Sequence, residues 1–479
     1  MSNNYGVSKW PDAAAIKKKM DALVGGELRH IKQDAMSKYL DYFETKCKKS
    51  KEMITDAKKY IPGGVQHNLA FNYPFPLAVE KADGAYLYDV DGNRYVDYLQ
   101  AGGATLLGSN YKAVTDKVLE VAKECSPVTG LFHEYEVKLA KKIRESMPWV
   151  EQYRSLASGT EADMVAIRLS RTFTEKKKIV KVGGAYHGWS DQLVYSLHIP
   201  YTQTFEAHGI PEECTANTTE CAPGSIESLR QILEANEKDG GTAAVIIEPF
   251  GPESGTRMTE FDYCKKVREL CDEFETLLIF DEVVTAFRVG PGGAQGYFNV
   301  RPDITVFGKI VSGGFPLAGG VGGREDIMSC MAAGVKAGKK RAYVGGTLTA
   351  NPLSCAAGYF ALDEIIKHDA AKKAGENADK LCVGIQKLID KYDLPFVTWN
   401  TGSIVHFEVS GVMYLSVKDP DIFKKIPQRQ HNIEEFGAAL TANGVITLAG
   451  SRIYTSMADN DETIKETLDA FDDVFSNIE

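Results

Sequence analysis

The sequence lacks the features that mark several classes of protein. No uncharged apolar run reaches the roughly 18 residues needed to span a bilayer. Residues 1–26 carry charges where a signal peptide needs an apolar core, so we expect no secretion signal. The formal net charge of -10 argues against a nucleic-acid or membrane partner. Nine cysteines form no Cys-x-x-Cys motif and no paired Cys/His spacing, which favours reduced thiols in a cytoplasmic protein.

What the 479 residues do contain is typical of a globular protein with two or three subdomains: 44% are hydrophobic and 25% are charged. The segment up to about residue 60 is polar with helical periodicity, and it ends at a turn in residues 61–64. Alternating residues around Asp91-Gly92 predict a β-hairpin. A C-terminal helix is predicted from one apolar stripe, formed by Ile464, Leu468, Phe471, Phe475 and Ile478.

Four short apolar runs alternate with helical segments in the middle of the chain. They are KKIVKVGG, TAAVIIEPF, TLLIFDEV and ITVFGK. Runs of this kind predict an α/β fold with a mostly parallel sheet covered by helices on both faces. We expect an N-terminal segment at residues 1–108, a large α/β domain at 109–362 and a smaller α+β domain at 363–479.

A carboxylate and an amine follow two of these runs. Asp281 comes directly after LLIF, and Lys309 stands alone after the next run. A carboxylate at the carboxyl end of a parallel strand is poorly solvated and needs a cationic partner. A protonated pyridine nitrogen at about 4 Å would supply about 4 kcal/mol at an effective dielectric near 20, and Lys309 would form a Schiff base with an aldehyde cofactor. On these residues alone, a metal-coordinating carboxylate and a surface lysine are an equal alternative.

The stretch LASGTEADMVAIRLSR places small residues before a helix. Free N–H groups and the helix dipole at Ser158, Gly159 and Thr160 suit a phosphate. The same residues also fit an ordinary helix N-cap, and both interpretations stay open. The predicted buried face of the helix consists of Ala162, Val165, Ala166, Leu169 and Phe173.

Four further residues stand where a ligand is expected. Tyr186 or His187, at the exit of the KKIVKVGG strand, would stack on a flat ring or pack in the core. Glu248 ends another strand, as a second carboxylate of the site or as a satisfied polar residue. Thr347 lies in a turn rich in hydroxyl groups and is a second candidate phosphate ligand.

Nine segments match one family's motifs in order. They are YDVDGNRYVDY, SGTEADMVAIRLSR, AYHG, IIEP, FDEVVTAFR, GGAQ, PDITVFGK, GGFPLAGGVGGR and GTLTANPLSCAAG. With these segments the chain resembles the class III aminotransferases, which depend on pyridoxal phosphate and have fold type I. Within the family it is most similar to the subgroup around glutamate-1-semialdehyde 2,1-aminomutase and the β-amino-acid aminotransferases. The likeness extends from Ile61 to the final helix.

The resemblance implies a role for each residue of the site. Lys309 would form the Schiff base (the internal aldimine) and shuttle a proton, and Asp281 would pair with the pyridine nitrogen. Val283 and Tyr186 would pack on opposite faces of the ring. The other cofactor-binding residues would be His187, Glu248, and, at the phosphate, Ser158, Gly159 and Thr160 from one subunit and Thr347 from the other. Sharing of the site in this way implies a homodimer, and no metal site is implied.

Substrate recognition is carried by two candidates. Several family members place an arginine after the PGG turn, where this chain has His67, a weaker and pH-dependent partner for a carboxylate. Arg452 stands where some β-amino-acid enzymes hold a carboxylate-binding arginine. The alternatives are a histidine merely hydrogen-bonded near the entrance and a surface arginine. The late segment offers no acidic residue before Asp459, where the aminomutases carry one, which weakens the aminomutase hypothesis.

We therefore expect an aminotransferase that moves an amino group from an amino acid, including β-amino acids, or from an amine to a 2-oxo acid. An intramolecular aminomutase of the glutamate-1-semialdehyde type is the second hypothesis, and a racemase on the same scaffold is the third. A non-catalytic binding protein would lack Lys309 or replace Asp281, and both are present.

Overall fold

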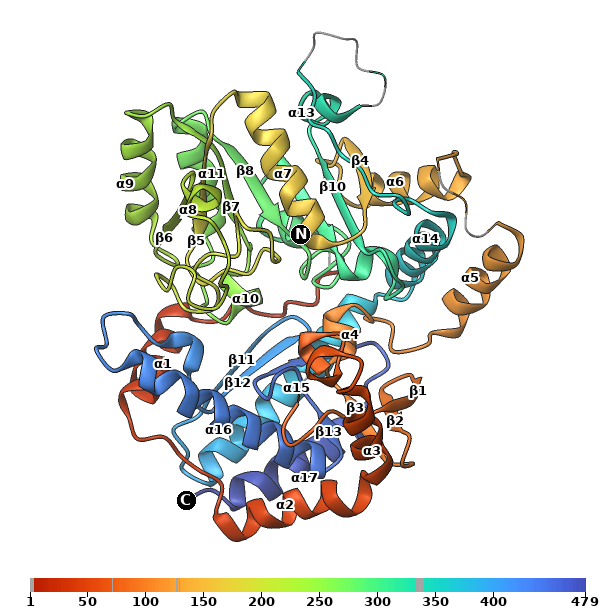
Figure 1. Ribbon diagram of the computed structural model, residues 1–479, viewed down its shortest axis with the longest axis vertical. Helices are drawn as coiled ribbons and strands as arrows, with labels where there is room; N and C mark the ends of the chain where they lie inside the picture. The colour runs from red at the N-terminus through yellow and green to blue at the C-terminus, as the bar shows by residue number, and fades with distance from the viewer. Residues whose placement is uncertain (1–3, 71, 126–127, 129, 333, 335–339) are drawn as a thin grey trace. The chain divides into compact units, whose positions relative to one another are not determined.

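The computed structural model describes residues 4–70, 72–125, 128, 130–332, 334 and 340–479. They form two compact units (Figure 1). The first unit is built from Lys112–Asp369 together with Tyr5, and the second from Gly6–Tyr111 and Ala370–Glu479. Among these residues, none of the helices combines the length and the apolar composition needed to cross a membrane.

The first unit contains a seven-stranded sheet in the order β4-β10-β9-β8-β7-β5-β6. Its strands are β4 (Gln152–Leu156), β5 (Lys178–Val182), β6 (Thr218–Cys221), β7 (Thr242–Ile247), β8 (Leu277–Asp281), β9 (Ile304–Gly308) and β10 (Gly319–Gly323). β10 is antiparallel to both of its neighbours, and the remaining four pairings are parallel. The predicted α/β class with a mostly parallel sheet is confirmed, and each of the four apolar runs is one of its parallel strands.

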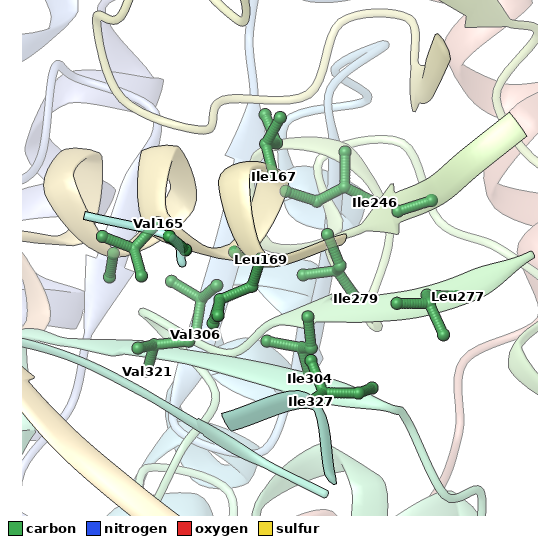
Figure 2. Close-up of a cluster of buried hydrophobic side chains, with 14 of the residues drawn as sticks. Val165, Ile167, Leu169, Ile246, Leu277, Ile279, Ile304, Val306, Val321 and Ile327 are labelled. Atoms are coloured by element: carbon green, nitrogen blue, oxygen red, sulfur yellow. The ribbon is translucent and has the colours of Figure 1, made fainter. Parts of the chain in front are cut away.

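Helices cover both faces of this sheet. The helices of this unit are α5 (Lys112–Glu124), α6 (Glu134–Ser146), α7 (Gly159–Thr174), α8 (Glu212–Thr215), α9 (Ile226–Glu237), α10 (Pro252–Gly255), α11 (Tyr263–Glu273), α12 (Gly293–Phe298), α13 (Glu325–Met328) and α14 (Pro352–Lys367). On one face, Leu169 of α7 belongs to the same core cluster as Ile246 and Ile279 (Figure 2). On the other, Val245 and Phe280 pack with residues of α9 and α11. Successive strand residues thus enter opposite cores, which explains why these strands are continuously apolar.

The second unit has two smaller antiparallel-rich sheets. The strands of the first are β1 (Val79–Asp83), β2 (Tyr86–Asp89), β3 (Arg94–Asp97) and β13 (Val445–Ile446), and those of the second are β11 (Val397–Thr401), β12 (Ile404–Glu408) and β14 (Arg452–Tyr454). The hairpin predicted around Asp91-Gly92 joins β2 to β3. The helices are α1 (Ala13–Gly25), α2 (Gln33–Lys46), α3 (Lys48–Ala57), α4 (Gln100–Gly103), α15 (Ala370–Lys391), α16 (Ile422–Ala442) and α17 (Asp461–Ser476).

The N-terminal helices are an integral part of the second unit. Met20 of α1 and Phe43 of α2 are 0% and 1% exposed. The carboxylate of Asp91, in the turn of the β2–β3 hairpin, accepts the backbone N–H groups of Lys49 (2.8 Å) and Ser50 (3.0 Å) at the start of α3. The hairpin therefore fixes the first turn of this helix, and the N-terminal segment helps to close the core of its own unit.

Two residues depart from the predicted helical stripes. Phe173, expected on the buried face of α7, is 37% exposed, and the guanidinium of Arg324 lies 5.7 Å from its ring centre. Phe173 stands in the last turn of α7, where a cation–π contact replaces burial. Ile478, expected on the C-terminal helix, follows its end at Ser476 and forms a β-bridge with Ile31.

We expect Leu169→Ala to lower the free energy of unfolding by about 3 kcal/mol, because it opens a cavity between α7 and the sheet. Leu169 is 0% exposed, whereas Val383, on α15, is 55% exposed. Val383→Ala is therefore the matched helical control and should change stability by less than about 0.5 kcal/mol. Urea denaturation followed by circular dichroism measures both. Equal midpoints for the two variants would contradict the core assignment.

Candidate active site

The carboxyl ends of the parallel strands place three chemically active side chains at one edge of the sheet. Asp281 is the last residue of β8, Glu248 follows β7, and Lys309 follows β9. β8 lies between β7 and β9. Neighbouring strands are about 4.8 Å apart, so the backbones of the three residues lie next to one another along this edge. Ligands of open α/β sheets bind at this edge.

Asp281 is buried and fully engaged by its neighbours. Its Oδ2 lies 2.7 Å from Nδ1 of His187, and its Oδ1 accepts the backbone N–H of Val283 at 3.0 Å. Asp281 is 6% exposed and His187 is 0% exposed. Burial lowers the pKa of His187, and the hydrogen bond to Asp281 offsets only part of that effect. A neutral imidazole that donates its Nδ1–H orients the carboxylate without neutralising it.

Lys309 has an unusual backbone conformation. Its φ of +46° lies in the left-handed region, which a residue with a side chain adopts at a cost of about 1–2 kcal/mol. It begins a short 3-10 turn, Lys309–Ser312, that ends the buried strand β9, and its side chain is half-buried. A lysine held in a strained turn beside a buried carboxylate is typical of a functional position.

The N-terminus of α7 is a closely packed turn. Ser158 is the N-cap, since its Oγ accepts the N–H of Glu161 at 3.2 Å. The cap interpretation of this stretch is therefore confirmed. A Cβ on Gly188 would lie 2.2 Å from Oγ1 of Thr160, so only glycine allows the turn after His187 to approach α7. The first N–H groups of a helix have no acceptor within the helix, which makes this turn a suitable cradle for a phosphate.

Val283 lies between two glycines. A Cβ on Gly159 would lie 2.9 Å from one of its methyl carbons, and a Cβ on Gly308 would lie 2.8 Å from the other. Larger residues at either position would displace the valine. Because its backbone N–H also binds Asp281, Val283 is fixed by contacts to α7, β8 and β9 together.

Glu248 organises the turn after β5. Its carboxylate accepts the backbone N–H groups of Tyr186 (3.0 Å), Glu253 (2.8 Å) and Ser254 (2.7 Å). Burial, with the charges of Glu253 and Asp281, raises the pKa of Glu248 to about 8. The side chain of Tyr186 is 44% exposed, and its ring stacks against that of His198, with centroids 6.4 Å apart. Glu248 therefore positions Tyr186 through the backbone.

A residue that the sequence analysis did not select completes the buried cluster. Asp163, in α7, is 1% exposed. One carboxylate oxygen each from Asp163 and Asp281 and one nitrogen of His187 lie within 4.8 Å of one another. Two charged carboxylates at that separation repel by about 3.5 kcal/mol at an effective dielectric near 20. A carboxylate three residues before Ala166 on an apolar helical face was the signal that could have revealed it.

The other three predicted residues lie elsewhere in the chain. Thr347 belongs to the first unit and is exposed in the loop before α14. His67 is exposed in the second unit, and its Nδ1 accepts the N–H of Leu69 at 3.1 Å. Arg452 begins β14 of the second unit and is 6% exposed, so the surface alternative for this residue is wrong. Their predicted roles toward phosphate and substrate stay predictions.

Comparison with known proteins identifies the family. The family model described as aminotransferase class III matches residues 69–475. The chain belongs to the class III aminotransferases. This class III chain is 36% identical over 362 residues, 74% of its length, to glutamate-1-semialdehyde 2,1-aminomutase 2 of Lachnoclostridium phytofermentans, of which the match covers 83%.

Solved structures extend the likeness to the fold. An omega-transaminase from Sphaerobacter thermophilus matches with a TM-score of 0.81 and 25% identity, over 91% of this chain and 99% of that one. A glutamate-1-semialdehyde aminomutase from Pseudomonas aeruginosa PAO1 has the same fold, with a TM-score of 0.78 and 21% identity over 99% and 100% of the two chains. The predicted family and fold type are confirmed, and with them a pyridoxal-phosphate-dependent enzyme.

The residues of the first unit fit pyridoxal phosphate. Asp281 is a buried carboxylate oriented for a cationic ring nitrogen, and His187 accompanies it. The N-terminus of α7 offers backbone N–H groups for the phosphate, and Lys309 offers an amine for the aldehyde. Nε2 of His187 and Oδ1 of Asp163 are buried without a hydrogen-bond partner among the described residues. Because buried polar atoms are normally hydrogen-bonded, a bound ligand or water is expected beside them.

We expect Glu248→Ala to destabilise the turn that carries Tyr186, because three backbone N–H groups lose their acceptor at a cost of about 1–3 kcal/mol each where they stay buried. Hydrogen exchange at the amides of Tyr186, Glu253 and Ser254 should accelerate together. Glu248→Gln, which keeps one acceptor oxygen, is the control and should protect part of the set. Unchanged exchange at all three amides in Glu248→Ala would contradict this role.

Proposed function

We propose that this class III enzyme transfers an amino group from an amino acid, including β-amino acids, or from an amine to a 2-oxo acid. The observation that carries amine chemistry at this site is the position of Lys309 at the end of β9, one strand away from Asp281 at the end of β8. The late segment, which has no acidic residue before Asp459, favours transfer over rearrangement. Pyridoxal phosphate, when bound, supplies an aldehyde that bonds to amines and a cationic ring that stabilises negative charge on the neighbouring carbon.

The chain's own residues then have distinct tasks. Asp281 holds a proton on the ring nitrogen, and the hydrogen bond from His187 keeps its carboxylate in place. The amine of Lys309 would hold the aldehyde and, when free, would accept and return the proton of the substrate carbon. Val283 and Tyr186 would pack on the two faces of the ring.

We also propose that the site is completed by a second copy of the chain. Thr347 is exposed in the single chain, as are the neighbouring Tyr343 (71%) and Leu348 (47%). An exposed apolar pair of this kind beside a hydroxyl group suits a subunit interface. The family pattern supports Thr347 as a ligand of the partner's phosphate, within a cytoplasmic homodimer.

An intramolecular aminomutase is the second candidate, supported by the 36% identity to glutamate-1-semialdehyde 2,1-aminomutase 2. Lys309 and Asp281 would perform the same tasks in that reaction. The two functions differ in whether a keto product leaves the enzyme. A racemase differs again, since it returns the amino acid with inverted configuration.

The absorbance spectrum of the purified enzyme, titrated with amino acids, β-amino acids and amines in the absence of an acceptor, tests the proposal. We expect the cofactor band to convert to the amine form of the cofactor, with release of a stoichiometric keto product. Lys309→Ala is the control: it should bind the cofactor but should not catalyse this conversion. A donor returned rearranged or racemised, with no keto product, would refute the aminotransferase in favour of the aminomutase or racemase.

We further propose that Arg452, and more weakly His67, binds the carboxylate of the substrate. Arg452→Ala should then raise KM about a hundredfold for carboxylated donors, the value of a charged hydrogen bond, and leave KM for plain amines within about threefold. His67→Ala is the comparison and should have the smaller effect. Equal losses on carboxylated donors and plain amines would show that Arg452 acts on folding or on the cofactor instead.

A further inference from the structure

Asp163 is a carboxyl group in surroundings that disfavour its charge. It stands in the second turn of α7 with 1% exposure, among Ala162, Val165 and Ala166, which are all buried. A carboxylate in such a position needs either a cation or a proton. Its polar atoms lie beside His187 and Asp281 at the point where the cofactor ring is expected.

The charged groups around Asp163 are mainly negative. Asp281 at the end of β8 and Glu248 at the end of β7 both raise its pKa. Glu253, in α10, adds negative charge beside Glu248 and His187. A buried cation near His187 is Lys181 of β5, which is 0% exposed and whose amine donates to the carbonyl groups of Ala185, Leu193 and Tyr195. These carbonyls already occupy its three protons.

Two orphaned atoms in the cluster are complementary. Oδ1 of Asp163 and Nε2 of His187 are both buried and have no hydrogen-bond partner among the described residues. Nδ1 of His187 is used by Asp281 at 2.7 Å. If that contact is a donated Nδ1–H, the neutral ring presents Nε2 as an acceptor. A protonated carboxyl on Asp163 is the donor that this acceptor lacks, and one water between the two atoms would complete the hydrogen bond.

We propose that Asp163 is a neutral carboxylic acid whose proton is donated toward Nε2 of His187, so that Asp281 is the one negative charge that faces the cofactor ring. Asp163 is thus a positioning residue: it fixes the tautomer of His187, and His187 fixes Asp281. Burial, reinforced by Asp281 and Glu248, raises the pKa of Asp163 well above its ordinary value, in agreement with this state. The inference rests on the proposed role of Asp281 toward the ring nitrogen.

The alternative occupant of the cluster is a metal ion. Asp163, His187 and Asp281 offer three ligand atoms within 4.8 Å of one another, and no ion accompanies them. A cation there would require Asp163 to be ionised and would compete with the cationic ring for Asp281. A bound proton leaves Asp163 neutral, whereas a bound metal ion requires it to be negative, and the experiment separates these two states.

Infrared difference spectra between the wild-type enzyme and Asp163→Asn at pH 7 test the proton directly. We expect a protonated-carboxyl C=O band that disappears in Asp163→Asn and persists in Ser170→Ala. Ser170 is the matched control because it is 0% exposed on the same helix and binds the carbonyl of Ala166 at 2.8 Å. Absence of the band in the wild type would overturn the inference, as would one bound metal ion per chain that Asp163→Asn loses.

Cofactor affinity supplies a second readout. Asp163→Asn keeps a neutral donor, so its Kd for pyridoxal phosphate should stay within about threefold of the wild type. Asp163→Ala removes the donor and should weaken binding about tenfold, the effect of one lost buried hydrogen bond. An ionised Asp163 predicts losses of similar size in both variants, because Asn and Ala would each remove a full charge. An unchanged cofactor spectrum in Asp281→Asn would overturn the role of Asp281 toward the ring nitrogen. A missing carboxyl band in the wild type would overturn only the neutral state of Asp163.

Discussion

The hydrogen bond between His187 and Asp281 is the constraint on which the site depends. It joins the exits of β5 and β8, two strands that flank β7 in the sheet. From the intervening strand, Glu248 binds the N–H of Tyr186, immediately before His187. The buried carboxylates of Asp281 and Glu248 therefore both hold the turn that contains Tyr186 and His187. The order of the strands sets the positions of these side chains around the cofactor ring. Glu248 orients the turn that carries His187, and His187 orients Asp281.

Burying acidic side chains at this edge of the sheet costs free energy of folding, and the apolar packing of the sheet offsets that cost. Asp163, Glu248 and Asp281 lie together with little exposure to water. Burial of these polar groups would favour solvent entry if the surrounding strands could separate. β7 and β8 prevent this because their side chains are divided between two cores, one against α7 and one against α9 and α11. Apolar burial at the centre of the sheet stabilises the fold, and the buried acids at its edge destabilise it, as is common at functional sites.

The sequence revealed those features that local pattern determines. Asp281 and Lys309 stood out because each follows an apolar run, and parallel pairing brings the ends of such runs to one edge. The apolar stripe of α7 does not by itself indicate the buried Asp163 within it, and it does not show that burial ends before Phe173 in the last turn of the helix. The hydrogen bond of His187 to Asp281 joins residues 94 positions apart. No local pattern encodes such a contact, whereas Arg452 and the role of Thr347 at a partner's phosphate were accessible only through family likeness.

A neutral Asp163 bears on the reaction in a way that does not depend on which substrate is used. Aminotransferase, aminomutase and racemase all need negative charge on the substrate carbon to be drawn into the ring, and this requires one carboxylate at the ring nitrogen. A second charged carboxylate beside the first would raise the basicity of the whole cluster and favour proton capture by His187, whose positive charge would then offset the negative charge that Asp281 presents to the ring. The buried proton on Asp163 removes that competition. The electronic part of the site is therefore fixed within the first unit, and the choice among reactions is left to the residues that hold or release the substrate.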